Sequence, residues 1–288
     1  MLHNDSTIVA LSLSKGLRND QRAQQMDNLE HNRRAWNRDS ASGQRWSVPV
    51  DAQTIARARR GDWQVILTPD TPVPADWFGS LAGAHVLCLA SSGGQQAPIF
   101  AAAGAAVVSF DLSDEQLARD TEVAARDGLA LRAVRGDMAD LSVFPDASFD
   151  LIFHPVSNVF VPDLTPVWRE CHRVLRDGGA LLAGCMNPAF FLFDHDRAQR
   201  TGELVARFRL PYREAGDASD TAQLSAARKA ELDAGDAFEF SHSLQAQIGD
   251  LLAAGFVLTA LYEDHWTGAS TPLDALMPTS IAMRAVKI

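Results

Sequence analysis

The chain has 288 residues, of which 47% are hydrophobic and 22% are charged, a composition typical of a globular protein with a substantial core. Its net charge of −10 excludes a general nucleic-acid binder, because no basic excess is present to neutralise phosphates. No apolar run reaches the roughly 18 residues of a spanning helix, and no signal peptide is evident, so we expect a cytoplasmic protein without a membrane partner. Wide spacing of Cys88, Cys171 and Cys185 favours buried thiols over disulfides or a zinc site, and we predict no metal.

The first 82 residues show no regular alternation of strands and helices. Residues 1–25 are polar and aperiodic, so we expect a disordered extension, with Met26 as the candidate natural start. Residues 26–82 combine short helical stretches with the proline-rich run 67–79, which is incompatible with a central strand. We therefore predict a helical and loop cap over 26–82 ahead of a main domain over 83–288.

Beyond residue 83, apolar runs of strand length alternate with helical stretches. The runs cover 85–90, 105–110, 129–134, 149–156 and 180–186. Continuous apolar runs of this length are typical of strands buried on both faces. The repeated β-α-β alternation predicts a doubly wound parallel sheet with right-handed crossovers.

Local signals place the helices and the end of the sheet. Ser113–Gln116 has the pattern of a capping box, and Thr165–Pro166 supplies a cap with a proline at the first helical position. Gly178–Gly179 is expected to end the second of these helices. Two further strands, 256–264 and 280–288, lie too close in sequence for a helical crossover and favour an antiparallel pair. The predicted fold is α/β, with a doubly wound, mostly parallel seven-stranded sheet and an antiparallel C-terminal pair.

The turn after the first strand reads Ala90-Ser91-Ser92-Gly93-Gly94, with Gln95 opening the next helix. In doubly wound sheets, ligands bind beyond the carboxyl ends of the strands. The two glycines permit close backbone approach, and the helix start favours an anionic group. Small residues at such turns also serve packing, which is the alternative interpretation.

Acidic residues follow the next two strands. Asp111 is placed to accept hydrogen bonds from ribose hydroxyls, with a loop or helix-start acid as the alternative. Asp137 can accept from an exocyclic adenine amine, while Met138 packs on the ring. Three consecutive strand ends thus predict a site for an adenosine-bearing cofactor.

The motifs "HVLCLASSGGQQ", "FDLSDEQL", "RGDMADL", "ASFDLIFHPV" and "CHRVLRDGGALL" resemble a class I S-adenosylmethionine-dependent methyltransferase over about residues 83–188. The sequence departs from the family pattern at Cys88, often acidic, and at Ala90 and Ser92, which replace loop glycines. The resemblance implies that S-adenosylmethionine is the cofactor. It assigns cofactor binding to Ala90, Ser91, Ser92, Gly93, Gly94, Gln95, Asp111, Leu112, Gln116, Asp137, Met138, His154, Pro155 and Val156.

A substrate-capping insert is predicted at about 189–240. Its rings Phe190, Phe191 and Phe193 either cap an apolar pocket or pack the insert onto the sheet. N-terminal tryptophans either fold over the cofactor or belong to the core. The candidate substrate residues are Trp36, Trp46, Asn158, Asn187 and Phe191.

Methyl transfer is an in-line displacement, so alignment is the main task, and a base is needed only for a protonated acceptor. By position His154 is the candidate catalytic residue, with a buried, hydrogen-bonded histidine as the alternative. The other polar candidates are Asp194, His195, Glu263, Asp264 and His265.

Three functions are compatible with these residues. The first is a methyltransferase acting on a small-molecule acceptor as a monomer or homodimer, without a nucleic-acid partner. The second is an NAD(P)-dependent oxidoreductase, since Asp111 also suits an NAD ribose; Asp137, the antiparallel finish and the incomplete G-x-G-x-x-G argue against it. The third is a silent S-adenosylmethionine-binding protein.

Overall fold

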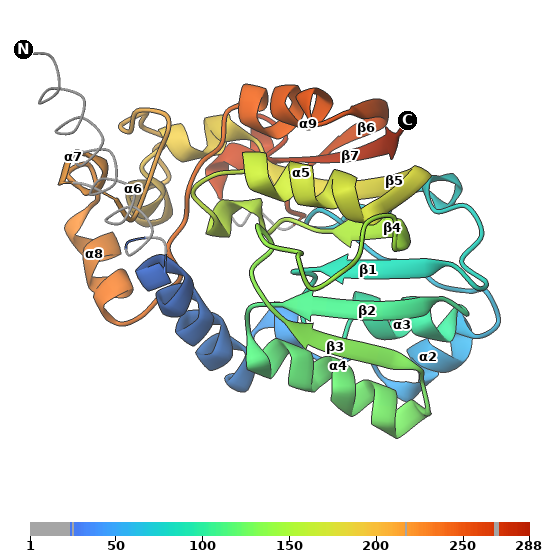
Figure 1. Ribbon diagram of the computed structural model, residues 1–288. Helices are drawn as coiled ribbons and strands as arrows, with labels where there is room; N and C mark the ends of the chain where they lie inside the picture. Colours follow the sequence, from blue (N-terminus) through green and yellow to red (C-terminus); the bar gives the residue numbers. More distant parts are fainter. Residues whose placement is uncertain (1–23, 25, 217, 268–270) are drawn as a thin grey trace, which may run out of the picture.

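The computed structural model describes residues 24, 26–216, 218–267 and 271–288 (Figure 1). The predicted disordered extension, apart from Gln24, lies outside the described residues. None of the helices in the described ranges is long and apolar enough to cross a membrane.

Seven strands form one sheet in the order β3-β2-β1-β4-β5-β7-β6 (Figure 1). Their bounds are β1 His85–Leu89, β2 Ala106–Asp111, β3 Leu131–Arg135, β4 Phe149–His154, β5 Leu175–Met186, β6 Phe256–Asp264 and β7 Ser280–Lys287. The first five strands pair in parallel, and β7 pairs antiparallel with both β5 and β6. The predicted sheet is confirmed, with the last strand inserted between β5 and β6.

Alternate side chains of each strand enter two different cores. Leu87 and Leu89 pack on the face covered by α5 (Thr165–Val174) and α9 (Asp250–Ala253), which follows a π-helical turn at Gln245–Gly249. Val86 and Cys88 pack on the face covered by α2 (Ala52–Ala58) and α3 (Gln96–Ala102). This period of two is what buries a continuous apolar run on both faces. All three cysteines are buried and free, as expected.

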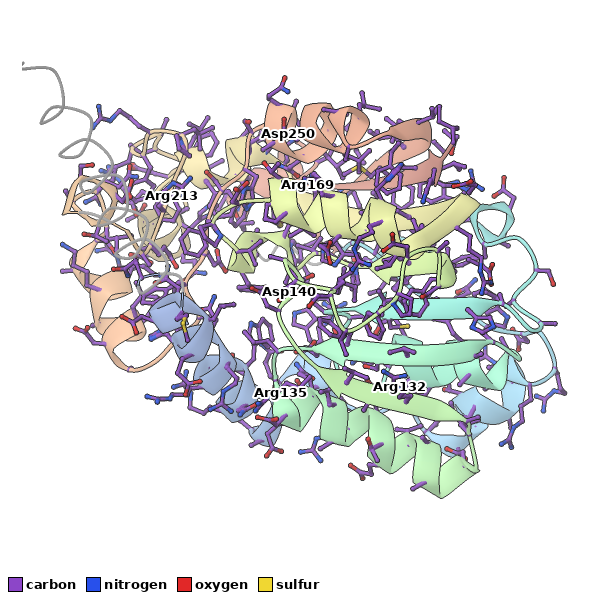
Figure 2. The ribbon with its side chains drawn as sticks, in the orientation of Figure 1. Arg132, Arg135, Asp140, Arg169, Arg213 and Asp250 are labelled. Carbon is purple, nitrogen blue, oxygen red and sulfur yellow. The ribbon has the colours of Figure 1, made fainter. Side chains whose placement is uncertain are left out.

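The strand at the β3 edge carries charged groups. Arg132 and Arg135 are exposed along it (Figure 2), and charges of this kind discourage pairing with another chain. Next to it, α4 (Asp114–Asp127) contacts β2, β3 and α3.

Three local predictions need adjustment. The Ser113 side chain accepts from the Gln116 backbone N–H as expected, but the Gln116 side chain turns away from the capping box. The N-cap of α5 is Leu164 rather than the predicted Thr165, and Asp163 just before it accepts from the backbone N–H of Thr165. Gly178–Gly179 does not end α5, which stops at residue 174, and lies inside β5 at a register irregularity.

The N-terminal helix (residues 26–41, blue) and the segment after β5 lie beyond the carboxyl ends of β1 to β4 (Figure 1). That segment contains η4 Pro188–Leu192, α6 His195–Thr201, α7 Ala218–Thr221 and α8 Ala226–Asp233. It has a core of its own, which includes Phe191, Tyr212 and Leu232. Both segments therefore stand over the sheet edge where the site is expected.

Candidate active site

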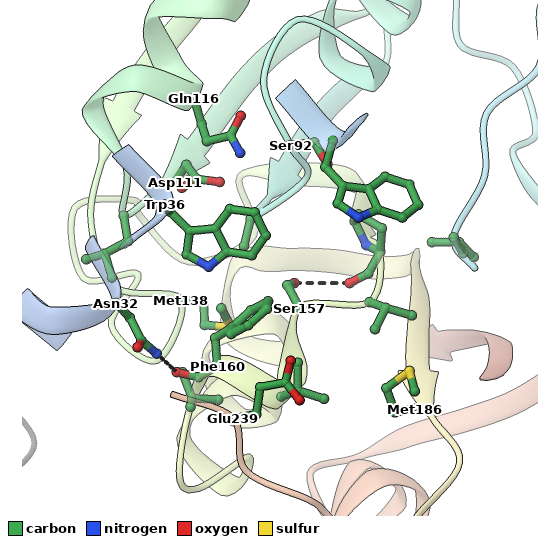
Figure 3. Close-up of a pocket in the computed structure, with 18 of the residues that line it drawn as sticks. Asn32, Trp36, Ser92, Asp111, Gln116, Met138, Ser157, Phe160, Met186 and Glu239 are labelled. Atoms are coloured by element: carbon green, nitrogen blue, oxygen red, sulfur yellow. Dashed lines mark hydrogen bonds between the residues drawn. The ribbon is translucent and has the colours of Figure 1, made fainter. Parts of the chain in front are cut away.

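A cavity of about 300 Å³ opens beyond the ends of β1 to β4 (Figure 3). Such volumes are at the lower end of those that hold small ligands. Strand-end loops form one side, and the N-terminal helix and the segment after β5 form the other. The predicted site residues in its lining are Trp36, Trp46, Ala90, Ser92, Asp111, Leu112, Gln116, Asp137, Met138, Pro155, Val156 and Phe191.

The turn after β1 keeps the backbone of a glycine loop at two positions where alanine and serine replace glycine. Ala90 and Ser92 both line the cavity and have φ angles of 47° and 71°. This left-handed region favours glycine and costs other residues roughly 1–2 kcal/mol each. Ala90 and Ser92 therefore depart from the family pattern in their side chains, while their backbone keeps the conformation that glycine favours. The neighbouring Ser91 is buried and does not line the cavity.

Gly93 and Gly94 were expected to contact the cofactor, but neither lines the cavity. A Cβ on Gly93 would clash with the backbone carbonyl of Gln116 on α4. The Gly94 N–H donates to Asp120 Oδ1 at 2.7 Å, and Ser109 donates its hydroxyl to the other oxygen of that carboxylate. Burial raises the pKa of Asp120 to about 7. The two glycines therefore let the loop pack tightly on α4.

At the start of α3, the residue that reaches the cavity is Gln96 rather than the predicted Gln95. The Gln95 amide donates to the carbonyls of Arg45, at 2.9 Å, and Val48, at 3.1 Å. Gln96 and Gln116 both line the cavity, and their side-chain carbonyl oxygens are buried without a hydrogen-bond partner among the described residues. Buried acceptors without a partner are uncommon in folded proteins.

The two strand-end acids are fixed by their own loops. Asp111 Oδ1 accepts from the Ser113 N–H at 2.8 Å, and Asp137 Oδ1 accepts from the Ala139 N–H at 2.9 Å. Burial raises the pKa of Asp111 to about 6 and also raises the pKa of Asp137. Both carboxylates are thus oriented and partly desolvated at the cavity wall, where hydroxyl or amine donors stabilise the charged form.

His154 does not line the cavity. Its ring is fully buried, with Nδ1 at 2.9 Å from the Leu89 carbonyl oxygen and Nε2 against the side-chain amide of Asn158. Both ring nitrogens face oxygen atoms, the Leu89 carbonyl and the Asn158 side-chain carbonyl, and burial lowers the pKa of the histidine. Both nitrogens have hydrogen-bond partners inside the protein, so neither is available to a methyl acceptor. The geometry contradicts the predicted catalytic and cofactor-binding roles and gives the histidine a structural one.

Two candidate substrate residues are also structural. Asn158 is buried, with its amide nitrogen 3.0 Å from the sulfur of Cys185. Asn187 caps η4 through the Ala189 N–H and donates to the Pro278 carbonyl at 3.1 Å. Neither lines the cavity.

The remaining polar candidates lie outside the cavity lining. Asp194 caps α6 and pairs with Arg207 at 2.6 Å, and Asp264 accepts from the backbone and hydroxyl of Thr71. His195 stacks on Phe190. Glu263 and His265 do not line the cavity either.

Several lining residues were not predicted: Asn32, Gln96, Ser157, Phe160, Met186, Glu239 and Trp266. Glu239 is the only acidic residue among them and comes from the end of the segment after β5. A signal existed for Gln96, since it adjoins the predicted Gln95. The same holds for Ser157, which lies between the predicted Val156 and Asn158, whereas no sequence spacing distinguished the others.

The strand order 3-2-1-4-5-7-6, with a reversed last strand and acids after β2 and β3, defines the class I methyltransferase architecture. Comparison with known proteins agrees. A family model described as "Methyltransferase domain" matches residues 87–183. The uncharacterized methyltransferase YbaJ of Bacillus subtilis is 44% identical over 260 residues, covering 90% of this chain and 98% of the relative. The chain therefore belongs to the S-adenosylmethionine-dependent methyltransferases, which sets aside the NAD(P)-dependent alternative.

Solved structures share the fold. A methyltransferase from Mesorhizobium loti has a TM-score of 0.56 and 19% identity, over 74% of this chain and 94% of that one. A Listeria monocytogenes protein described as a putative methyltransferase also has a TM-score of 0.56, with 16% identity over 74% of this chain and 95% of that one. At these identities the likeness concerns the fold alone.

Proposed function

We propose that this methyltransferase transfers a methyl group to a small-molecule acceptor held in the same cavity as the methyl donor. One observation carries the proposal: a single cavity runs from the strand-end acids to an aromatic wall formed by Phe160, Phe190 and Phe191. The N-terminal helix and the capping insert, for which we keep the bounds 189–240, enclose that wall. A concave cavity of this size suits a small acceptor rather than a polymer.

At the donor end, the residues present fit S-adenosylmethionine. Asp111 would accept from ribose hydroxyls, and Asp137 with Met138 would hold adenine. Gln96 and Gln116 line the same end of the cavity. When bound, this cofactor supplies a methyl group on a positively charged sulfur.

At the acceptor end, apolar side chains exclude water and orient the acceptor. Phe190 and Phe191 form an edge-to-face pair, and Trp36 meets Phe160 edge-to-face at 4.9 Å between ring centroids. Holding two reactants in line supplies most of the catalysis that a displacement of this kind requires.

Calorimetric titration with S-adenosylhomocysteine and with NAD tests the donor end, and transfer of labelled methyl to a panel of amines, alcohols, thiols and carboxylic acids tests the acceptor end. We expect saturable S-adenosylhomocysteine binding, no NAD binding and transfer to at least one class. Binding of NAD, or the absence of S-adenosylhomocysteine binding, would refute the proposal.

A further inference from the structure

The ionisable side chains that line the cavity are all acidic. Asp111, Asp137 and Glu239 contribute carboxylates, and among the described residues the lining contains no lysine, arginine or histidine. Carboxylates in a largely apolar wall attract cations and repel anions, because the low local dielectric strengthens both effects. This charge pattern disfavours carboxylate or phosphate acceptors.

Glu239 lies on a different wall of the cavity from Asp111 and Asp137. It projects into the cavity from the side opposite Asp111 and Gln116, beside Phe160 (Figure 3). Within the described part of the chain, its carboxylate has no hydrogen bond and no ion pair. A partly buried carboxylate without a partner is unfavourable for stability, so its retention at a cavity wall points to a ligand that completes it.

The backbone of Glu239 is held by a buried ion pair. The Glu239 N–H donates to Glu214 Oε2 at 2.8 Å, and the Glu214 N–H donates to the Glu239 carbonyl at 3.1 Å. Glu214 is itself paired in a bidentate manner with Arg228, at 2.7 and 2.8 Å, and accepts from the Tyr212 hydroxyl. Arg228 also donates to Asp236 at 3.2 Å.

The charged groups around Glu239 thus pair with one another, Arg228 with Glu214 and Asp236, and none of them pairs with the Glu239 carboxylate. Desolvation and the negative charge of Glu214 raise the pKa of Glu239 to about 7, and Arg228 offsets this only in part. A carboxylate poised near neutral pH both attracts a cation and accepts its proton.

We propose that Glu239 is the general base for the acceptor, and that the acceptor is a primary or secondary amine carried on an apolar body. This inference rests on the proposed function above. The apolar body would pack on Phe190, Phe191 and Met186, while Phe160 and Trp36 present aromatic rings that attract an ammonium group.

The reaction balances without a further reactant. A bound ammonium group, R–NH3+, gives one proton to the Glu239 carboxylate and becomes R–NH2. Its nitrogen lone pair forms a bond to the methyl carbon while the carbon–sulfur bond breaks, and that electron pair stays on sulfur. The products are R–NH2–CH3+ and S-adenosylhomocysteine, and Glu239 returns its proton to water. Desolvation lowers the pKa of the ammonium group and raises that of the carboxyl, which makes the proton transfer less unfavourable.

The experiment compares wild type with Glu239→Gln, Glu239→Asp and Glu203→Gln, the last being a matched control at an exposed residue of the same insert. Calorimetry measures S-adenosylhomocysteine binding, and labelled methyl transfer is measured on apolar amines and on their alcohol and carboxylic-acid counterparts. We expect Glu239→Gln to bind S-adenosylhomocysteine normally, unfold at or above the wild-type temperature, and lose about 100-fold or more in kcat/KM for amines.

Two further readouts separate a base from a structural residue. Wild-type kcat/KM should rise with pH and level off above about 7, where Glu239 is ionised, whereas the residual activity of Glu239→Gln should keep rising with the fraction of free amine. Glu239→Asp should keep the plateau with a smaller loss, and Glu203→Gln should match wild type. The inference is overturned if Glu239→Gln methylates amines as fast as the wild-type enzyme does. It is also overturned if the wild-type enzyme methylates only alcohols or carboxylic acids. Failure of wild type to bind S-adenosylhomocysteine refutes the proposed function itself.

Discussion

The donor end of the cavity is built from loops at the ends of neighbouring strands, and the acceptor end from segments that are distant in sequence. The donor end comes from three successive strand-end loops, those after β1, β2 and β3. The acids after β2 and β3 accept from backbone N–H groups of their own loops, and the loop after β1 donates to Asp120 on the adjacent helix α4. The acceptor end gathers residues from the N-terminal helix, the turn after β4 and both ends of the insert. Local backbone geometry therefore determines the donor end, and contacts between distant segments determine the acceptor end.

Asn32 shows how the distant segments are joined. Its buried side-chain amide donates to the carbonyls of Phe160, at 3.1 Å, and Phe238, at 3.2 Å, and accepts from the Phe238 N–H at 2.7 Å. One side chain of the N-terminal helix thus connects two walls of the acceptor end. At the donor end the corresponding side chain is Asp120, which joins the loop after β1 to the neighbouring strand β2 and helix α4.

The largest effect is expected where the donor loop is anchored. Asp120→Ala removes the acceptor for both the Gly94 N–H and the Ser109 hydroxyl, and two unsatisfied buried donors cost about 2–4 kcal/mol. Chemical denaturation should show that loss in the free energy of unfolding, together with weaker S-adenosylhomocysteine binding. Asp120→Asn is the matched control, since its amide still accepts from Gly94 and pairs with Ser109. Equal stability of the two variants would contradict an anchoring role.

A smaller effect is expected from Asp111→Asn. Hydrogen bonds to a charged group contribute about 1.5–3 kcal/mol, so affinity for S-adenosylhomocysteine should fall about 10- to 100-fold in calorimetry. Asp140→Asn is the control, because Asp140 lies on the loop after β3 and does not line this cavity (Figure 2). If both substitutions leave binding unchanged, the donor end has been wrongly assigned.

Asn32→Ala tests the acceptor end with a smaller expected effect. Loss of the contacts to Phe160 and Phe238 should loosen that wall, at a cost of about 1–2 kcal/mol. We expect kcat/KM for the acceptor to fall about tenfold, with S-adenosylhomocysteine affinity within about twofold of wild type. A parallel loss of both would show that the two ends are not independent. Asn28→Ala, one turn earlier on the same helix, is the control.

What the sequence could predict follows the same division. Strand runs, the reversed last strand and Asp111 follow from periodicity and from the rule that ligands bind at strand ends. His154 satisfied the same rule, but its ring lies on the face of the sheet covered by α5, near Trp168, because successive side chains of a strand point to opposite faces. Gln96 replaced Gln95 because a helix start rotates side chains by about 100° per residue.

Glu239 was beyond this kind of prediction. It follows an apolar residue in an irregular segment, and its position depends on the pairing of Glu214 with Arg228 across the insert. Interactions between residues so far apart leave no periodic signal. The sequence therefore predicted the aromatic residues Trp36 and Phe191 of the acceptor end, whereas its one carboxylate was found only from the structure.

The smallest effect concerns the left-handed turn at the donor end. Ala90→Gly relieves a strain of roughly 1–2 kcal/mol at φ 47°, but glycine also gains freedom in the unfolded chain, which offsets about 0.4–1 kcal/mol. We expect a net stabilisation of about 0.5 kcal/mol in chemical denaturation. Ala102→Gly in α3 should have the opposite sign, a loss of about 1 kcal/mol, because a helix disfavours glycine. Destabilisation by Ala90→Gly would mean that the alanine methyl group contributes more through packing than the backbone loses through strain.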